Sequence, residues 1–206
     1  MKNLLILLFP ILFFGQQKDE WNFYMKEALN DIKNEDFLSA KSKLQKTIEL
    51  DPKNPAPYYF KGFAEIIMND EEQGCKSLIE SIYLHFNHAQ QLYAEKCIRY
   101  NPKLNIENFK SGKYELMFLD NTNTFYKYLF ERKNDIQYEN YEGKIYSGKI
   151  IWIGDGDYTI IADEKTEKEM DKNPKFYTRV LKIIGNEYLY IKIEENQVAY
   201  GIIKKL

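Results

Sequence analysis

Residues 21–54 read WNFYMKEALNDIKNEDFLSAKSKLQKTIELDPKN, and residues 55–86 read PAPYYFKGFAEIIMNDEEQGCKSLIESIYLHF. The second stretch repeats the pattern of the first at an offset of 34 residues, with large and small side chains in matching places. The clearest pairs are Tyr24 with Tyr58, Ala28 with Gly62, Ala40 with Gly74, Leu44 with Leu78, and Ile48 with Ile82. A period of this length is typical of stacked helical hairpins, each of which buries its apolar face against its neighbour.

Each copy predicts two helices. In the first copy, apolar residues at helical spacing predict helices over residues 21–33 and 37–50. Pro52 and Pro55 end the second of these, because proline cannot continue a helix. The second copy predicts the same arrangement over residues 57–83, with its turn at Asn69 and Asp70. A further helix from about Ala89 is expected to cap the array.

These two copies resemble tetratricopeptide repeats. The residues that carry the resemblance are Tyr24, Ala28, Phe37, Ala40, Leu44, Thr47 and Pro52 in the first copy, and Tyr58, Gly62, Gly74, Leu78 and Ser81 in the second. Charged residues stand where the family usually has apolar ones, at Glu27, Asp31, Lys61 and Glu65. The resemblance implies a protein-binding scaffold whose first helices line a concave groove.

A groove of this kind would be lined by Met25, Leu29, Ile32, Tyr59, Phe63 and Ile66. We expect it to hold another protein or an extended peptide segment. The alternative is that the capping helix or the C-terminal half of the same chain covers this surface, because short arrays leave apolar faces uncovered.

The two cysteines, Cys75 and Cys97, are each 11 residues from the expected turn near Phe86. They should therefore lie level with each other on adjacent helices, so that a disulfide is possible if their Cα atoms come within about 7 Å. The alternative is two independently buried thiols.

The N-terminus differs from the rest of the chain. Lys2 is followed by an apolar run from Leu4 to Phe14, interrupted by Pro10, and polar residues begin after Gly15. This pattern predicts a signal peptide over residues 1–15, and the run is shorter than the roughly 20 residues of a membrane-spanning helix. We expect an exported protein, periplasmic or secreted, that keeps no stable membrane span after cleavage.

Composition limits the possible partners. The chain has 206 residues and a formal net charge of −2, and neither half has an excess of Lys and Arg. Nucleic-acid binding normally requires a basic face, so we expect no nucleic-acid partner.

From residue 105 onward the period changes to that of strands. Tyrosine-rich and β-branched segments, separated by turn signals, predict strands over residues 113–118, 124–132, 135–141, 144–153, 157–162, 176–184, 187–194 and 197–204. The one long connection, residues 163–174, is highly charged and is expected to be a solvated excursion. The fold class is therefore α+β: helical repeats over residues 17–104, then an antiparallel meander over 105–206 that forms an open sheet or a small barrel.

The order of features in this half loosely resembles small exported bacterial β-domains of unassigned function. The features are residues 109–112, then Glu131 and Arg132, then residues 152–158. The resemblance implies no active site.

The sequence predicts a non-enzymatic scaffold protein with no catalytic residues, metal or cofactor. The only histidines, His85 and His88, have no further ligands at a spacing typical of a zinc site. The main hypothesis is protein binding by the helical array. The alternative is that a barrel in the C-terminal half binds a small ligand, a lipid or a sugar, since tyrosine combines a flat ring with a hydrogen-bonding tip.

Overall fold

The structure is a computed structural model of residues 1–206. It describes the backbone of residues 8–119, 125–141, 143–169, 176–194 and 197–206, and leaves undescribed the side chains of residues 8–16, 118–119, 125–126, 141 and 169. The first half of the predicted signal peptide, residues 1–7, lies outside the described residues. The chain divides into two compact units, Met1–Tyr100 and Asn101–Leu206, where the sequence predicted a boundary after residue 104.

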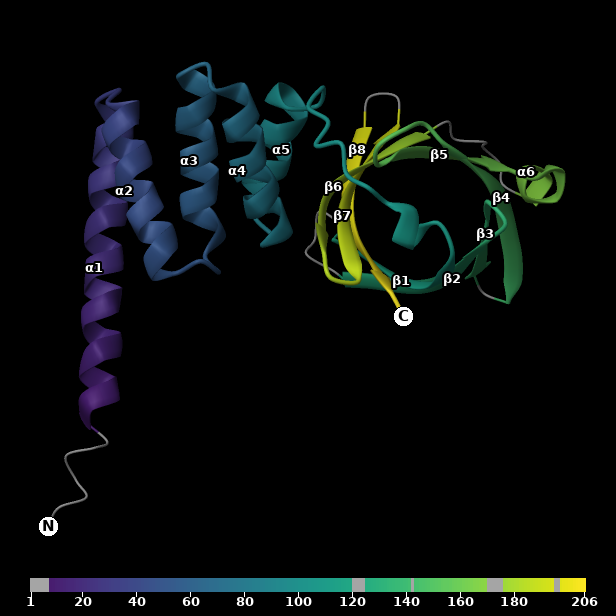
Figure 1. The fold of residues 1–206 in the computed structure, drawn as a ribbon, viewed down its shortest axis with the longest axis horizontal. Helices are drawn as coiled ribbons and strands as arrows, with labels where there is room; N and C mark the ends of the chain where they lie inside the picture. The colour runs from purple at the N-terminus through teal and green to yellow at the C-terminus, as the bar shows by residue number, and fades with distance from the viewer. Residues whose placement is uncertain (1–7, 120–124, 142, 170–175, 195–196) are drawn as a thin grey trace, which may run out of the picture. The chain divides into compact units, whose positions relative to one another are not determined.

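The first unit consists of helices (Figure 1). They are α1 (Leu8–Lys33), α2 (Phe37–Leu50), α3 (Pro55–Ile67), α4 (Glu71–Tyr83) and α5 (Asn87–Lys96). Helix α1 pairs with α2, and α3 pairs with α4, as two hairpins at the 34-residue offset. The turns of the two hairpins match, because Glu35 and Asn69 both have a φ of 62°.

Small residues let the paired helices approach. Ala28 and Ala40 are fully buried in the first hairpin. At the equivalent place in the second, a Cβ on Gly62 would lie 2.9 Å from the carbonyl oxygen of Gly74. Glycine is therefore required at position 62 for the observed spacing.

The charged residues that depart from the repeat pattern bridge the helices of each hairpin. Lys43 Nζ donates to Asp31 Oδ2 at 2.7 Å in the first, and Ser77 Oγ donates to Glu65 Oε2 at 2.7 Å in the second. Asp31 and Glu65 are equivalent positions, 34 residues apart. The buried Glu65 carboxylate is compensated by Lys41 and by Lys61, each with Nζ 3.1 Å from Oε1. These charged side chains therefore hold neighbouring helices together.

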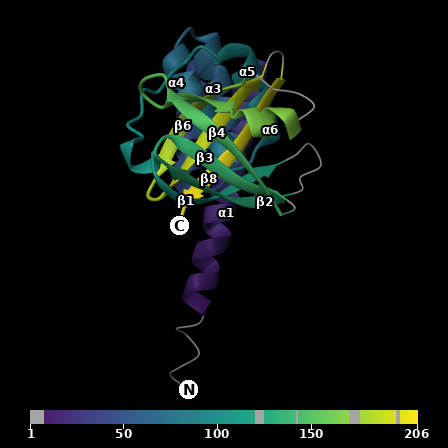
Figure 2. The same ribbon diagram turned by 90° about the vertical axis from the view of Figure 1, so that its right-hand side faces the viewer.

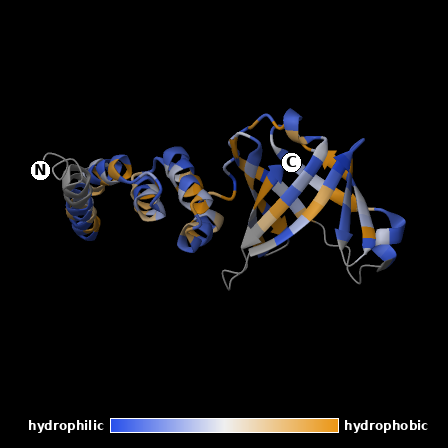
Figure 3. Cartoon of the chain, turned by 90° about the horizontal axis from the view of Figure 1, so that it is seen from below, coloured by the Kyte–Doolittle hydropathy of each residue, from blue (hydrophilic) through white to orange (hydrophobic). Residues whose placement is uncertain are grey.

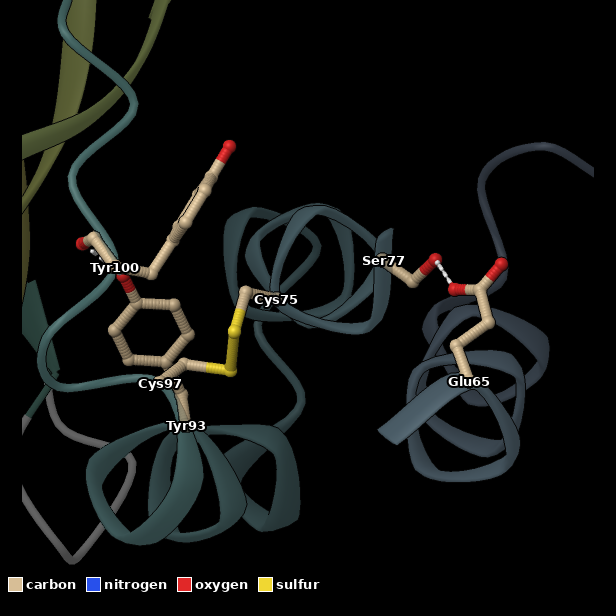
Figure 4. Close-up of a disulfide and its surroundings, with 6 residues drawn as sticks. All are labelled: Glu65, Cys75, Ser77, Tyr93, Cys97 and Tyr100. Atoms are coloured by element: carbon tan, nitrogen blue, oxygen red, sulfur yellow. Dashed lines mark hydrogen bonds between the residues drawn. A yellow bond between two sulfur atoms is a disulfide. The ribbon is translucent and has the colours of Figure 1, made fainter. Parts of the chain in front are cut away.

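A disulfide joins α4 to the end of α5. Cys75 and Cys97 are linked with their Cα atoms 5.6 Å apart, and both are fully buried. Figure 4 shows the ring of Tyr93 beside this bond, with its hydroxyl donating to the carbonyl oxygen of Tyr100 at 3.4 Å. The disulfide thus fixes the capping helix to the second hairpin.

The second unit is a closed, antiparallel barrel of eight strands in chain order, with β1 paired to β8. Its strands are β1 (Gly112–Leu119), β2 (Phe125–Lys133), β3 (Ile136–Tyr141), β4 (Lys144–Trp152), β5 (Asp157–Ala162), β6 (Phe176–Ile184), β7 (Glu187–Glu194) and β8 (Gln197–Lys205). The α+β class predicted from the sequence is confirmed, and the choice between open sheet and barrel is decided in favour of the barrel.

Alternating residues give the barrel an inside and an outside. Hydropathy alternates along the strands in Figure 3, as expected where successive side chains point to opposite faces. The core of the unit contains Tyr114, Phe130, Ile150, Tyr158, Val180 and Tyr188, all buried. The short 3₁₀ helix η1 (Glu107–Phe109) projects within the ring of strands in Figure 1, and Phe109 packs against Tyr188 with ring centroids 5.0 Å apart. It closes one end of the barrel.

Candidate functional site

The barrel contains a cavity of about 240 Å³ that is partly open to solvent. At ~30 Å³ per water molecule, this space would hold about eight waters or one small ligand. The described aromatic residues that line it are Tyr128, Phe130, Tyr146, Tyr158, Phe176 and Tyr190. Barrels of eight strands are either filled by their own side chains or just wide enough for a small ligand, and this one leaves space.

Arg132 forms the floor of the cavity at the end closed by η1. Its Nη1 donates to the carbonyl oxygen of Phe109 at 3.2 Å, and its Nη2 donates to the hydroxyl of Tyr158 at 2.9 Å. The Arg132 side chain is 2% exposed and makes no salt bridge with a carboxylate of the described residues. Its Nε donates to Gln137, and the hydroxyl of Tyr188 is a further hydrogen-bonding group beside the guanidinium.

Aromatic rings surround this buried cation. The guanidinium carbon lies 4.8 Å from the ring centroid of Tyr158, 5.2 Å from Phe130, 5.3 Å from Tyr114 and 5.6 Å from Trp152. Cation–π attraction of this kind strengthens where water is excluded, and it offsets part of the cost of burying the charge.

A chain of hydrogen bonds runs from Arg132 through a neutral amide to a carboxylate of the cavity wall. Arg132 Nε donates to Gln137 Oε1 at 2.9 Å, and Gln137 Nε2 donates to Glu139 Oε1 at 2.5 Å. The amide of Gln137 therefore connects a cation to an anion. Further along, Lys192 Nζ lies 3.0 Å from Glu194 Oε2 and 4.4 Å from the ring centroid of Phe176. Both cations of the wall are thus compensated within the barrel.

The hydroxyls of Tyr128 and Tyr190 in the cavity wall are available to a ligand. Neither Tyr128 nor Tyr190 has a hydrogen-bond partner among the side chains and backbone that the structure describes, although Tyr190 is only 8% exposed. Burial raises the pKa of both groups, with the Glu139 carboxylate adding to the effect at Tyr128. Both hydroxyls therefore remain protonated at neutral pH and can donate as well as accept.

Gly201 on β8 makes room for Tyr190. The two residues are partners in the β7–β8 register, and a Cβ on Gly201 would lie 2.6 Å from the Tyr190 hydroxyl oxygen. Because real Cβ atoms do not approach so closely, the tyrosine side chain can occupy its position only beside glycine.

The barrel wall is held by few strand pairs between β5 and β6. These strands pair only at Asp157 with Arg179 and at Tyr158 with Thr178. Beyond this point the cavity lining includes Thr166, from the short helix α6 (Glu164–Glu169), which lies beside β4 in Figure 2. Thr166 Oγ1 accepts a hydrogen bond from the backbone N–H of Ser147 on β4 at 2.9 Å.

Residues 163–174 were expected to be a solvated excursion, and residues 163–165 and 167–168 are exposed, whereas Thr166 is buried; residues 170–174 lie outside the described residues. The helix begins after Asp163, whose Oδ1 accepts from the backbone N–H of Thr166 at 2.7 Å. Hydrogen bonds from Ser147 and Thr166 lower the pKa of the Asp163 carboxyl. One residue of the charged segment, Thr166, is buried and contributes to the cavity wall.

The residues predicted to line a helical groove do not share one environment. Met25 is buried in the core of the first hairpin, with Ile32 packed against the same cluster. The side chain of Ile66 lies over Gly74, so close that a Cβ there would be 2.6 Å from Ile66 Cγ1. These three positions pack inside the hairpins, because each first helix also has to bury residues against its own second helix.

Of the remaining three predicted groove residues, Leu29 is exposed, whereas Tyr59 and Phe63 are half-buried, as Ile32 and Ile66 are. Leu29 is 39% exposed, and Phe63 packs edge-on against Phe37 with ring centroids 6.3 Å apart. Tyr59 contacts the ring of Phe86, 5.3 Å away, just before α5. The segment leading into the capping helix therefore covers part of this surface.

The described residues include no group of three or more His, Cys, Asp or Glu that could hold a metal ion. Among the described helices, none combines the length and apolar character needed to cross a membrane. Comparison of the chain with protein-family models, with curated proteins and with solved structures finds no match.

The sequence alone did not predict site roles for Arg132, Gln137, Glu139, Tyr128 or Tyr190. A signal was present, since Tyr128, Phe130 and Arg132 alternate on one strand and must share a face. Such alternation places a charged residue on an aromatic face, which is unusual unless that face has polar partners.

Proposed function

We propose that the C-terminal unit binds one small ligand inside its barrel. The observation that carries this proposal is Tyr190, whose side chain is 8% exposed at the cavity and whose hydroxyl has no hydrogen-bond partner among the described residues. Polar groups inside folded proteins are nearly always hydrogen-bonded, to protein groups or to ordered water. A ligand in the cavity that accepts or donates at this hydroxyl would supply such a partner. Pockets with apolar walls and a few convergent polar groups are typical ligand sites.

Native mass spectrometry of the full chain, purified from envelopes of its source cells, tests this proposal. We expect a small-molecule adduct that is lost in Ala162→Leu, because Ala162 lines the cavity and a larger side chain fills it. Its neighbour Ile161 is 54% exposed on the outside, so Ile161→Leu is the matched control and should keep the adduct. An adduct equally abundant in both variants would place the ligand elsewhere.

A second candidate function concerns the helical unit, whose resemblance to tetratricopeptide repeats implies peptide binding. The partial exposure of Leu29, beside Tyr59 and Phe63 on first helices of the two hairpins, supports this candidate. Alanine at Tyr59 and Phe63 tests it. Loss of a captured protein partner from the folded double variant is the expected result, and unchanged capture would remove the candidate.

We further propose that the protein acts outside the cytoplasm, as a binding protein without catalytic activity. The apolar N-terminal run supports export, and a disulfide between Cys75 and Cys97 suits an oxidising compartment. N-terminal sequencing of the protein from its source cell should find a chain that starts near Gln16. A chain that starts at Met1 would contradict cleavage.

A further inference from the structure

The cavity wall also indicates which class of ligand it would take, an inference that rests on the proposed ligand-binding function. We infer that the ligand is a single neutral sugar ring or a similar cyclic polyol. Three properties of the wall lead to this assignment: its charge balance, its remaining hydrogen-bonding capacity and its aromatic surface.

Charge balance argues against an ionic ligand. Arg132 and Glu139 are connected through the Gln137 amide by hydrogen bonds of 2.9 and 2.5 Å. Lys192 is paired with Glu194 at 3.0 Å. Each cation is matched by an anion of the barrel itself, so a charged ligand would introduce an unmatched charge into a partly enclosed cavity. Such a charge is costly, and a neutral ligand avoids the cost.

The remaining hydrogen-bonding capacity is mixed. The second oxygen of the Glu139 carboxylate has no described partner and can accept a hydrogen bond. The hydroxyls of Tyr128 and Tyr190 can do either. A sugar hydroxyl is also both donor and acceptor, so a ring carrying several hydroxyls matches this set. A fatty acyl chain would leave most of these groups unpaired.

Aromatic surface and size agree with a ring. Tyr128, Phe130 and Tyr190 present flat faces or edges to the space, and apolar faces of sugar rings stack on such side chains. The volume of about 240 Å³ suits one compact ring and is small for the pockets that bury larger ligands, which run to about 1,000 Å³.

The test is a titration of the full chain, followed by ligand-observed NMR, with two sets of probes. The first set is neutral: glucose, galactose, mannose, xylose, N-acetylglucosamine and myo-inositol. The second set is octanoate and octylamine, which carry a charged head and an acyl-like chain. We expect at least one neutral probe to bind and to be displaced by the small-molecule fraction of the source envelope, and neither charged probe to bind.

Variants then assign the binding to the proposed groups. Tyr190→Phe should lower the affinity for the sugar about fivefold or more. Glu139→Gln should lower it about tenfold or more, because a hydrogen bond to a charged group is stronger. The matched controls are Tyr138→Phe and Glu131→Gln, which make the same chemical changes at exposed positions of β3 and β2. These controls should leave the affinity unchanged.

The outcomes separate this inference from the proposed function. Binding of octanoate or octylamine that is lost in Ala162→Leu, with no sugar bound, would keep the cavity as a ligand site but overturn the assignment of a sugar. Sugar binding unaffected by Tyr190→Phe and Glu139→Gln would also overturn it. No binding of any probe, together with no adduct in native mass spectrometry, would remove both.

Discussion

Tyr190→Phe should lower the affinity for the ligand without lowering the free energy of unfolding. A residue kept for folding loses stability when its hydroxyl is removed, and the net loss for a hydrogen bond is about 1 kcal/mol. The Tyr190 hydroxyl has no partner among the described residues, so its removal breaks no described bond. We therefore expect the free energy of unfolding of the ligand-free protein to be unchanged or slightly increased, while ligand affinity falls.

Tyr114→Phe is the matched control, because Tyr114 is fully buried in the same barrel and its hydroxyl donates to the carbonyl oxygen of Ser111 at 2.8 Å. This variant should lose about 1 kcal/mol. Urea denaturation followed by the fluorescence of Trp152, in a Trp21→Phe background, measures the barrel alone, since these are the two tryptophans of the chain. Equal losses of unfolding free energy in the two variants would contradict the prediction, because they would show that the Tyr190 hydroxyl is hydrogen-bonded within the protein.

Three further predictions concern the helical unit. Cys75→Ser removes a crosslink between residues 22 apart in sequence and should lower the free energy of unfolding by about 3 kcal/mol in the chain-entropy account, measured by urea denaturation; an unchanged midpoint would contradict a formed disulfide. Lys43 lowers the pKa of Asp31, so this carboxylate stabilises the fold above its unfolded pKa of about 3.9, and the contribution is lost as pH falls through the lower folded value. Melting temperatures between pH 6 and 2 should therefore fall less in Asp31→Asn, and parallel curves would count against the pair. Gly74→Ala places a Cβ 2.6 Å from Ile66 Cγ1 and should cost about 1–3 kcal/mol by thermal denaturation, whereas a gain would show that α3 and α4 separate freely.

The helical half follows from the sequence because its contacts are local. Equivalent pairs such as Ala28 with Gly62 predicted where two helices approach, and the structure has small residues at these crossings. The residues that line the expected groove were harder to predict, because an apolar residue on a first helix can face either that groove or its own hairpin. Met25 and Ile66 face their hairpins, and periodicity does not distinguish the two cases.

The barrel half was predictable strand by strand, but its closure was not. The closing pairs, such as Tyr114 with Lys205, join residues at the two ends of the unit, and alternation says nothing of such distant partners. The cavity could not be predicted from the sequence for the same reason. Its floor combines Arg132 with Phe109 and Tyr158, which come from separate elements. Thr166 entered the wall from a segment whose composition predicted only exposure.

The most direct test of a ligand inside the barrel is a crystal structure of the full chain purified from envelopes of its source cells. We expect density for one small molecule in the cavity, with a polar atom within hydrogen-bond distance of the Tyr190 hydroxyl. A cavity closed by rearranged Tyr128 and Tyr190 side chains, with both hydroxyls paired to protein groups, would contradict it.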